Sequence, residues 1–120
     1  MPKSCSGMYS TSVTPAAFSG TWSGQVTQPP TDTYNVTVTL VAGQQSGTIS
    51  YTGASISTCS GQLTVTSASA TKMTMSQGMA QSMVQKGCSN GTVSVTLTGP
   101  GTLSFTFQST PQASGTLTRR

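Results

Sequence analysis

Apolar and small polar residues alternate along most of this chain. In "YNVTVTLVA" (34–42), Val36, Val38 and Leu40 fall on one face and threonines occupy positions on the other. The segment "GTVSVTLTG" (91–99) repeats the arrangement with two valines and a leucine. A period of two residues is that of a β-strand with one buried face, and the β-branched threonine side chain suits the outer face of a pleated sheet. The alternation therefore predicts an all-β protein.

About eight such segments follow one another, with short turns between them, a spacing typical of a β-barrel or a β-sandwich. The segment "TGPGT" (98–102) is predicted to be a tight hairpin, and "SNGT" (89–92) holds the Asn-Gly turn signal. Consecutive hairpins favour a meander, and closing a meander removes its unpaired edges. We therefore predict a small antiparallel up-and-down β-barrel, with a β-sandwich as the alternative. The predicted strands are 20–27, 34–42, 47–52, 61–67, 71–76, 91–99, 101–107 and 113–119.

At 120 residues and 12.2 kDa the chain fits one domain. Residues 1–17 show no periodicity and are predicted to be a flexible tail or linker, so that the barrel spans 18–120. The segment "SQGMAQSMVQKG" (76–87) interrupts the alternation. Its methionines, together with Met75, are spaced four apart, which indicates a short helix or a long loop.

The composition argues against catalysis. The chain has no histidine and one acidic residue, Asp32, and roughly a third of it is serine or threonine, far above ordinary usage. A pair of carboxylates, a Ser–His–Asp triad and a histidine-bearing zinc site are therefore all excluded. Only Ser–Lys and cysteine-nucleophile schemes remain formally open. We expect no enzyme activity, no cofactor and no metal.

The remaining residues with binding chemistry also favour simple roles. Met73, Met75, Met79 and Met83 resemble a thioether copper(I) set, but no Cys or His adjoins them, so they are predicted to fill the core. The net charge of +4 comes from scattered Lys and Arg residues, which predicts no nucleic-acid binding and a weak attraction to anionic envelope polymers or lipids. No segment is apolar enough to span a membrane as a helix.

The chain has three cysteines. Cys59 and Cys88 both lie near the ends of predicted strands, and a bridge between them would close a loop of about 30 residues and contribute roughly 3–4 kcal/mol. We predict this disulfide, which is typical of an oxidising compartment. The alternative is a pair of buried free thiols. Cys5 is left over in the predicted tail.

The order of the motifs "FSGTWSGQVTQ", "YNVTVTLVAG", "CSGQLTVTSASATKMTM", "GCSNGTVSVTLTGPGTLSFTF" and "ASGTLTR" resembles the small β domain of actinobacterial membrane serine/threonine protein kinases. That domain also occurs in stand-alone secreted or lipid-anchored proteins. The likeness covers residues 18–119. It implies an extracytoplasmic location and a sensing or interaction role, with no catalytic residues here, since the kinase motifs are absent from this chain.

A wider likeness is to the calycins, the lipocalin and avidin-like barrels, which carry Gly-x-Trp on the first strand and an arginine at the end of the last strand. Gly20 and Trp22 match the first feature, and Arg119, with Arg120 as the alternative, matches the second. The resemblance implies that the arginine lies over the Trp22 ring in a cation–π contact and closes one end of the barrel. Trp22 and Arg119 are therefore predicted to be a barrel-closing pair.

The interior decides between the function hypotheses. A packed core would favour a non-catalytic sensor or interaction domain that meets an envelope ligand or a protein partner outside the cytoplasm. A hollow core would favour a carrier for a small apolar molecule, and a structural cell-surface protein is a third hypothesis. If a pocket exists, it should open at the end away from Trp22. Its predicted lining is Tyr51, Met73, Met75, Phe105 and Phe107.

Overall fold

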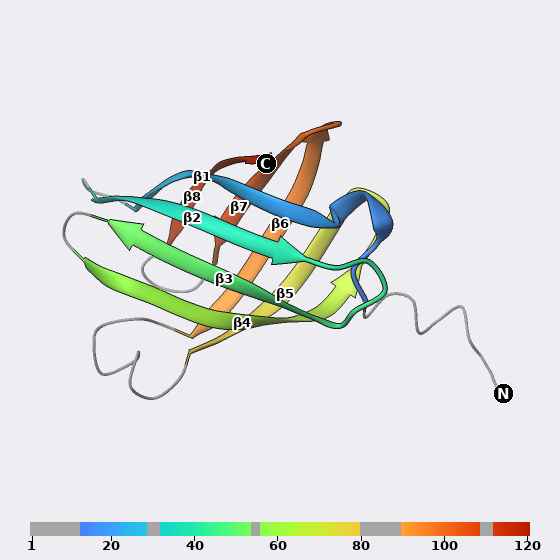
Figure 1. Cartoon of the computed structure of the whole chain (residues 1–120), viewed down its shortest axis with the longest axis horizontal. Helices are drawn as coiled ribbons and strands as arrows, with labels where there is room; N and C mark the ends of the chain where they lie inside the picture. Colours follow the sequence, from blue (N-terminus) through green and yellow to red (C-terminus); the bar gives the residue numbers. More distant parts are fainter. Residues whose placement is uncertain (1–12, 29–31, 54–55, 80–89, 109–111) are drawn as a thin grey trace, which may run out of the picture.

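Eight antiparallel strands form a closed barrel in the computed structural model (Figure 1). The structure describes residues 13–28, 32–53, 56–79, 90–108 and 112–120. Each strand pairs with its neighbours in the sequence, and β8 pairs back onto β1. The predicted up-and-down barrel is therefore confirmed, and the sandwich alternative is wrong. The strands are β1 (Gly20–Gln28), β2 (Asp32–Leu40), β3 (Ser46–Gly53), β4 (Ile56–Ala68), β5 (Lys72–Met79), β6 (Gly91–Gly99), β7 (Thr102–Phe107) and β8 (Ala113–Arg119).

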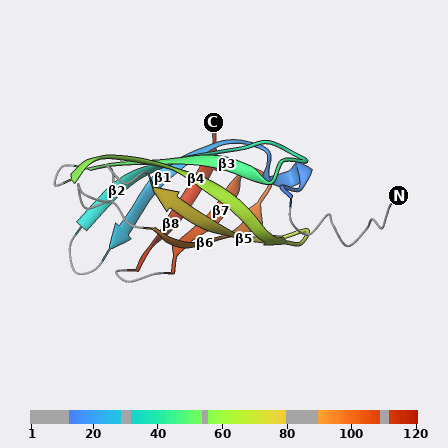
Figure 2. The same cartoon turned by 90° about the horizontal axis from the view of Figure 1, so that it is seen from below.

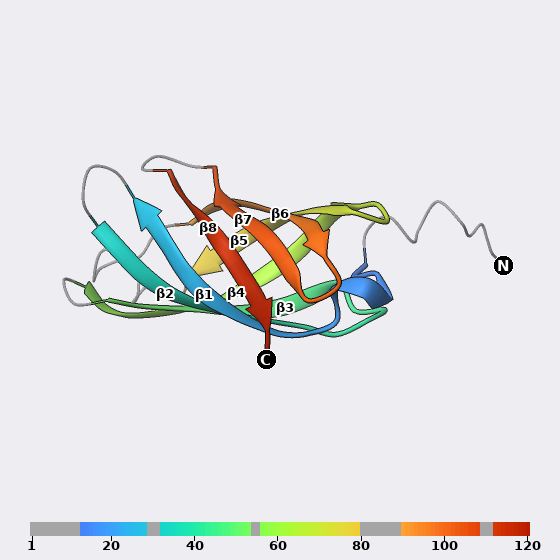
Figure 3. The ribbon, with the colours of Figure 1, turned by 90° about the horizontal axis from the view of Figure 1, so that it is seen from above.

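The two ends of the barrel differ in what lies at them. The β2–β3, β4–β5 and β6–β7 turns lie at one end, together with a short 3-10 helix, Ala16–Phe18, which precedes β1 (Figures 1 and 3). We call this the Trp22 end, because Trp22 lies near the start of β1. The other four connections between consecutive strands leave from the opposite end, which we call the far end. The turn between β6 and β7 is the hairpin predicted at 98–102.

Figure 2 shows the two sides of the barrel from below, and the inward-facing side chains between them form one hydrophobic core. Their burial follows the predicted alternation, as in β7, where the apolar side chains are buried and the intervening hydroxyl side chains are not. Leu63, Met75 and Phe105 are fully buried. A hollow wide enough for a water molecule would leave accessible surface on the side chains around it. The middle of the barrel is therefore packed, as protein interiors are.

Glycines allow β1 and β8 to approach each other at the point where the barrel closes. A Cβ atom added at Gly24 would overlap the carbonyl oxygen of Thr116 and lie 3.1 Å from the Cα of Leu117. A Cβ atom added at Gly115 would overlap the carbonyl oxygen of Gln25. Backbone atoms cannot move aside as a flexible side chain can. The contact between the first and last strands therefore depends on the missing side chains of these two glycines.

The outer face of the barrel is covered with hydroxyl groups and carries little charge. Hydroxyl side chains pair across successive strands, with Ser23 opposite Thr37, Thr37 opposite Ser50 and Ser50 opposite Ser60. Neighbouring strands lie about 4.7–4.9 Å apart, so these residues form a row across four strands. Among the residues that the structure describes, Val41 is the large apolar residue with an exposed side chain.

Two predictions made from the sequence need correction. The beginning of the 76–87 segment is neither helix nor loop, because β5 runs on to Met79. A spacing of four residues is also twice the strand period, so Met75 and Met79 lie on the same inner face of β5, and Met79 packs against the core. Met83 and the rest of this segment, 80–87, lie outside the described residues.

The predicted tail is also too long. Thr14, which we placed in a flexible tail, is buried, and its N–H donates to the carbonyl oxygen of Gln44 at 2.9 Å. The N–H of Gly43 in turn donates to the carbonyl oxygen of Thr14 at 2.9 Å. Residues 14–18 therefore belong to the folded domain and lie across the Trp22 end. Residues 1–12 of the predicted tail lie outside the described residues.

The closing contact between β1 and β8 predicts unequal effects of two glycine substitutions. Gly24→Ala should lower the free energy of unfolding by about 2–4 kcal/mol, because the added methyl group forces the two backbones apart. Gly78 in β5 is the matched control, since a Cβ atom there meets nothing within 4 Å. Gly78→Ala should therefore change stability by less than about 1 kcal/mol. Urea unfolding followed by Trp22 fluorescence measures both, and equal losses would contradict this account of the closure.

Candidate functional site

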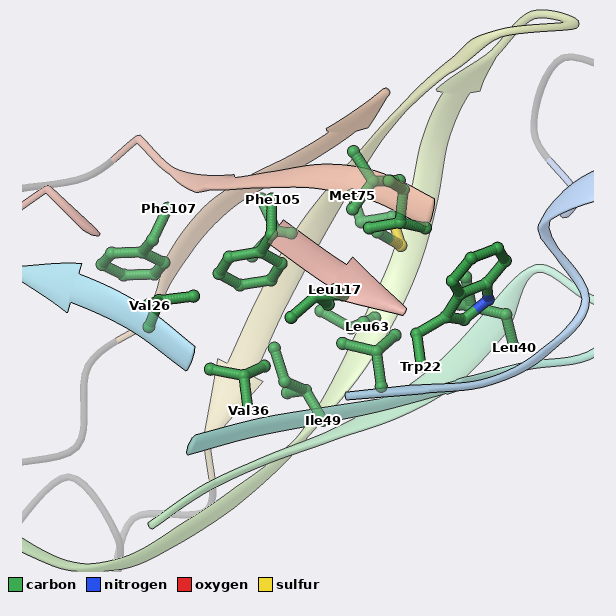
Figure 4. Packing of buried hydrophobic residues seen from close by; sticks show 14 of the residues in the cluster. Trp22, Val26, Val36, Leu40, Ile49, Leu63, Met75, Phe105, Phe107 and Leu117 are labelled. Atoms are coloured by element: carbon green, nitrogen blue, oxygen red, sulfur yellow. The ribbon is translucent and has the colours of Figure 1, made fainter. Parts of the chain in front are cut away.

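Trp22 is a structural plug at its end of the barrel and presents no surface for a ligand. Its side chain is fully buried, and its indole N–H donates to the carbonyl oxygen of Phe18 at 2.9 Å. A buried tryptophan needs such a partner because its indole N–H is otherwise unsatisfied. Figure 4 shows the ring lying beside Leu40 at one end of the row of buried side chains.

The structure brings together the predicted barrel-closing pair. Trp22 and Arg119 are opposite each other in the β1–β8 ladder, and the guanidinium carbon lies 4.5 Å from the centroid of the Trp22 ring. A guanidinium donor of Arg119 also bonds the carbonyl oxygen of Ala17 at 2.8 Å. Arg119, and not Arg120, therefore joins the last strand both to the first strand and to residues 14–18. Within the described residues, Arg120 is held by a backbone bond from its N–H to the carbonyl oxygen of Thr21, at 2.8 Å.

Gly20 makes room for the Arg119 side chain. Its φ is +126°, a backbone conformation that residues with a side chain rarely adopt. A Cβ atom at this position would also lie 3.4 Å from the Nε of Arg119. The glycine of the Gly-x-Trp motif is therefore explained by backbone conformation and by its contact with the arginine.

The far end holds a polar contact inside the barrel. The Tyr51 hydroxyl on β3 donates to the Oε1 of Gln77 on β5, at 2.5 Å, across the intervening strand β4. The Tyr51 ring also contacts Phe105 edge to face, with centroids 6.4 Å apart and planes at 68°. Burial raises the pKa of the Tyr51 phenol above its ordinary value, and the hydrogen bond to Gln77 offsets this only in part.

The core residues that keep some solvent exposure lie at this far end. Tyr51 is 9% exposed, whereas Trp22 and Phe105 are fully buried. The other core residues with 5% exposure or more lie on the same part of the barrel. They are Tyr34, Cys59, Phe107 and Ala113.

The predicted pocket lining does not form one group. Tyr51, Phe105 and Phe107 lie toward the far end, as predicted. Met73 lies instead toward the Trp22 end, beside Ala68 at the β4–β5 turn. Met75 is fully buried, and Figure 4 shows it between Phe105 and Trp22. The strands of a barrel are tilted and staggered, so residues equally far from the ends of their strands can lie at different heights along the barrel axis.

Cys59 lies in β4 with its side chain buried, and it is disulfide-bonded. Cys88 lies outside the described residues, as does Cys5. The Cys59–Cys88 pairing therefore stays a prediction.

The described residues offer little for chemistry. Within these ranges no three His, Cys, Asp or Glu residues gather in a way that could hold a metal ion. No helix in the part of the chain that the structure describes is long and apolar enough to cross a membrane.

Comparisons with known proteins support the fold alone. No family model matches the chain, and no curated protein matches it. Among solved structures, the chain is similar to a redesigned β-barrel, with a TM-score of 0.66 over 88% of this chain and 93% of that chain. The two sequences are 20% identical. This likeness agrees with the barrel architecture.

The Trp22–Arg119 contact predicts that two adjacent arginines differ in their effect on stability. Arg119→Gln should lower the free energy of unfolding by about 1 kcal/mol, because it removes a cation–π contact and a bond to Ala17 from an exposed side chain. Acrylamide should also quench Trp22 more strongly in this variant. Arg120→Gln is the matched control and should leave both quantities unchanged. If the two variants behaved alike, Arg119 would have no special role in closing the barrel.

The buried Tyr51 phenol predicts a loss of stability at alkaline pH. Its pKa is higher in the folded state than in the unfolded state, so folding favours the neutral form. This contribution is fully present below about pH 10 and is lost as the pH rises above that value, by about 1 kcal/mol at pH 11. Tyr51→Phe should remove this part of the pH dependence. Urea unfolding of both proteins between about pH 8 and pH 11 measures how the free energy of unfolding changes with pH. If the free energies of the two proteins fell in parallel over this range, the prediction would be contradicted.

Proposed function

We propose that this barrel is a non-catalytic recognition domain that acts outside the cytoplasm. In the fuller form of the proposal it is the extracellular domain of a bacterial membrane serine/threonine protein kinase or of a related secreted protein. The observation that carries the proposal is the filled interior. A barrel whose core is occupied by its own side chains meets a partner on its outer surface.

The packing weighs against a carrier. Sites for small molecules are cavities of about 300–1,000 Å³ that enclose most of the ligand. In the described barrel the side chains at the level of Leu63, Met75 and Leu117 are fully buried against one another. A cargo molecule would have to displace them, and a well-packed core resists such overpacking by about 1–3 kcal/mol for even a few added methylene groups.

The chemistry of the side chains supports a role without catalysis. General acid–base catalysis needs a positioned group of tuned pKa, usually His, Glu, Asp or Lys. The sequence holds no histidine or glutamate. Lys72, the lysine that the structure describes, is exposed on the outer face. Tyr51 is a buried titratable group, but its hydroxyl is bonded to Gln77, and burial favours its neutral form.

The outer surface suits an exposed position in the cell envelope. Rows of hydroxyl groups keep the barrel wettable without charge, so it is not drawn strongly to any charged polymer along its sides. The same surface fits a structural cell-surface protein, which is the second candidate function. The two candidate functions differ in whether the barrel is part of a longer signalling protein.

An antibody raised against the purified barrel tests the proposal in the organism that encodes it. We expect the antibody to label intact cells, because the domain is outside the membrane. On an immunoblot it should detect a membrane-bound polypeptide far larger than 12.2 kDa that incorporates phosphate from ATP. A small, wall-associated band without phosphate incorporation would favour the structural protein. Labelling that appears only after the cells are lysed would overturn the extracytoplasmic location.

Native mass spectrometry of the purified barrel tests the alternative of a carrier in the same preparation. The expected spectrum shows the protein without a retained lipid or other apolar molecule. Phe105→Ala is a suitable positive control, because an apolar cavity in the core can bind small apolar molecules such as benzene. A stoichiometric apolar ligand in the unaltered protein would overturn the reading of the interior as filled.

A further inference from the structure

The positively charged side chains that the structure describes lie at one end of the barrel. Arg119 ends β8 at the Trp22 end and Arg120 follows it, and Lys72 begins β5 beside the β4–β5 turn, at that same end. All three side chains are exposed. Asp32, the sole acidic residue of the sequence, begins β2 at the far end. The charges of the described residues therefore give the barrel a positive end and no acidic side chain to offset it there.

An exposed apolar residue lies at the same end. Val41, at the start of the β2–β3 turn, is 55% exposed. Ala42 follows it, and the next residue, Gly43, is bonded through its N–H to the backbone of Thr14. The β2–β3 turn that Val41 begins is therefore bonded to residues 14–18, which lie at this end of the barrel (Figure 3).

The apolar turn and the cations are connected through these residues. Thr14 is bonded to the β2–β3 turn on one side. Ala17, three residues later, is exposed, and its carbonyl oxygen accepts the bond from Arg119. The Trp22 end thus carries a surface made up of the exposed residues Val41, Ala42, Ala16, Ala17, Arg119 and Arg120, together with Lys72 at the start of β5. We call this surface the Val41–Arg120 face.

We propose that the Val41–Arg120 face docks on the surface of a membrane that contains anionic phospholipids. Cationic side chains beside an anionic bilayer each contribute to binding, and an apolar side chain between them enters the boundary of the acyl chains. Arginine and lysine also place their charge at the headgroups while their stems cover apolar surface. The inference deepens the proposed function, since it names the surface that an envelope domain meets and rests on that location.

An anionic bilayer fits this face better than a soluble anionic polymer does. A polymer is held by charge alone and needs no exposed valine. Among the residues that the structure describes, the cations lie at one end of the barrel, and not along a groove or stripe that a chain could follow. A flat, charged surface that meets one end of the barrel satisfies both observations.

Co-sedimentation with lipid vesicles tests the proposal. The intact protein should sediment with vesicles of phosphatidylglycerol and phosphatidylcholine at low salt, and less at high salt. It should not sediment with vesicles of phosphatidylcholine alone. The test variant moves two charges to the far end without changing the net charge of +4, because it removes two cations and adds two. Its substitutions are Lys72→Gln, Arg120→Gln, Gln108→Lys and Gln112→Lys, all at exposed positions.

We expect the relocated charges to weaken vesicle binding at least tenfold, on the basis of about fivefold for each cation lost from the face. Arg119 is kept because it contacts Trp22. Val41→Ser, which leaves every charge in place, should weaken binding severalfold. Urea unfolding of each variant checks that the fold is intact, and all the substituted side chains are exposed.

Two results would overturn the proposal. One is equal binding by the intact protein and the charge-relocated variant, which would show that net charge alone is responsible. The other is binding to a soluble anionic polysaccharide that is as tight as binding to vesicles and insensitive to Val41→Ser. Neither result changes the outcome of the antibody experiment on cells. The vesicle experiment can therefore overturn membrane docking by the Val41–Arg120 face without overturning the proposed function.

Discussion

The contact between β1 and β8 is the constraint on which this fold depends. Seven of the eight strand pairings join neighbours in the sequence, and each is favoured by a short connection. The pairing of β1 with β8 joins the two ends of the domain and has no such advantage. It exists because Gly24 and Gly115 let the two backbones come close, and because Arg119 reaches across to Trp22 and Ala17. Closure is thus specified by backbone space and by one long side chain.

Much of the fold was predictable because a strand with one buried face has a period that shows directly in the sequence. The alternation of valine and threonine in β2 and β6 identifies both strands and the faces that they bury. The same period cannot separate a barrel from a sandwich, since both bury one face of every strand. Likewise, Met75 and Met79 are four apart, which fits a helix and a strand equally well.

The candidate site was predictable only where a motif pointed to it. The Gly-x-Trp motif and the terminal arginine anticipate the contact of Trp22 with Arg119. Nothing periodic marks Thr14 or Ala17, because these residues are held through their own backbone N–H and carbonyl groups, which every residue type other than proline carries. The bond from Tyr51 to Gln77 crosses the interior between strands that are not neighbours, so no pairing rule from the sequence anticipates it.

The closure of the barrel by hydrogen bonds between β1 and β8 also limits how a partner can be recognised. Many proteins bind an extended peptide by adding it as a new strand at an exposed sheet edge, where backbone groups provide the affinity. A closed barrel presents no such edge, since every strand already has a neighbour on both sides. Specificity then has to come from side chains. Among the described residues these side chains are hydroxyl groups along the sides and, at one end, a valine and a few cations.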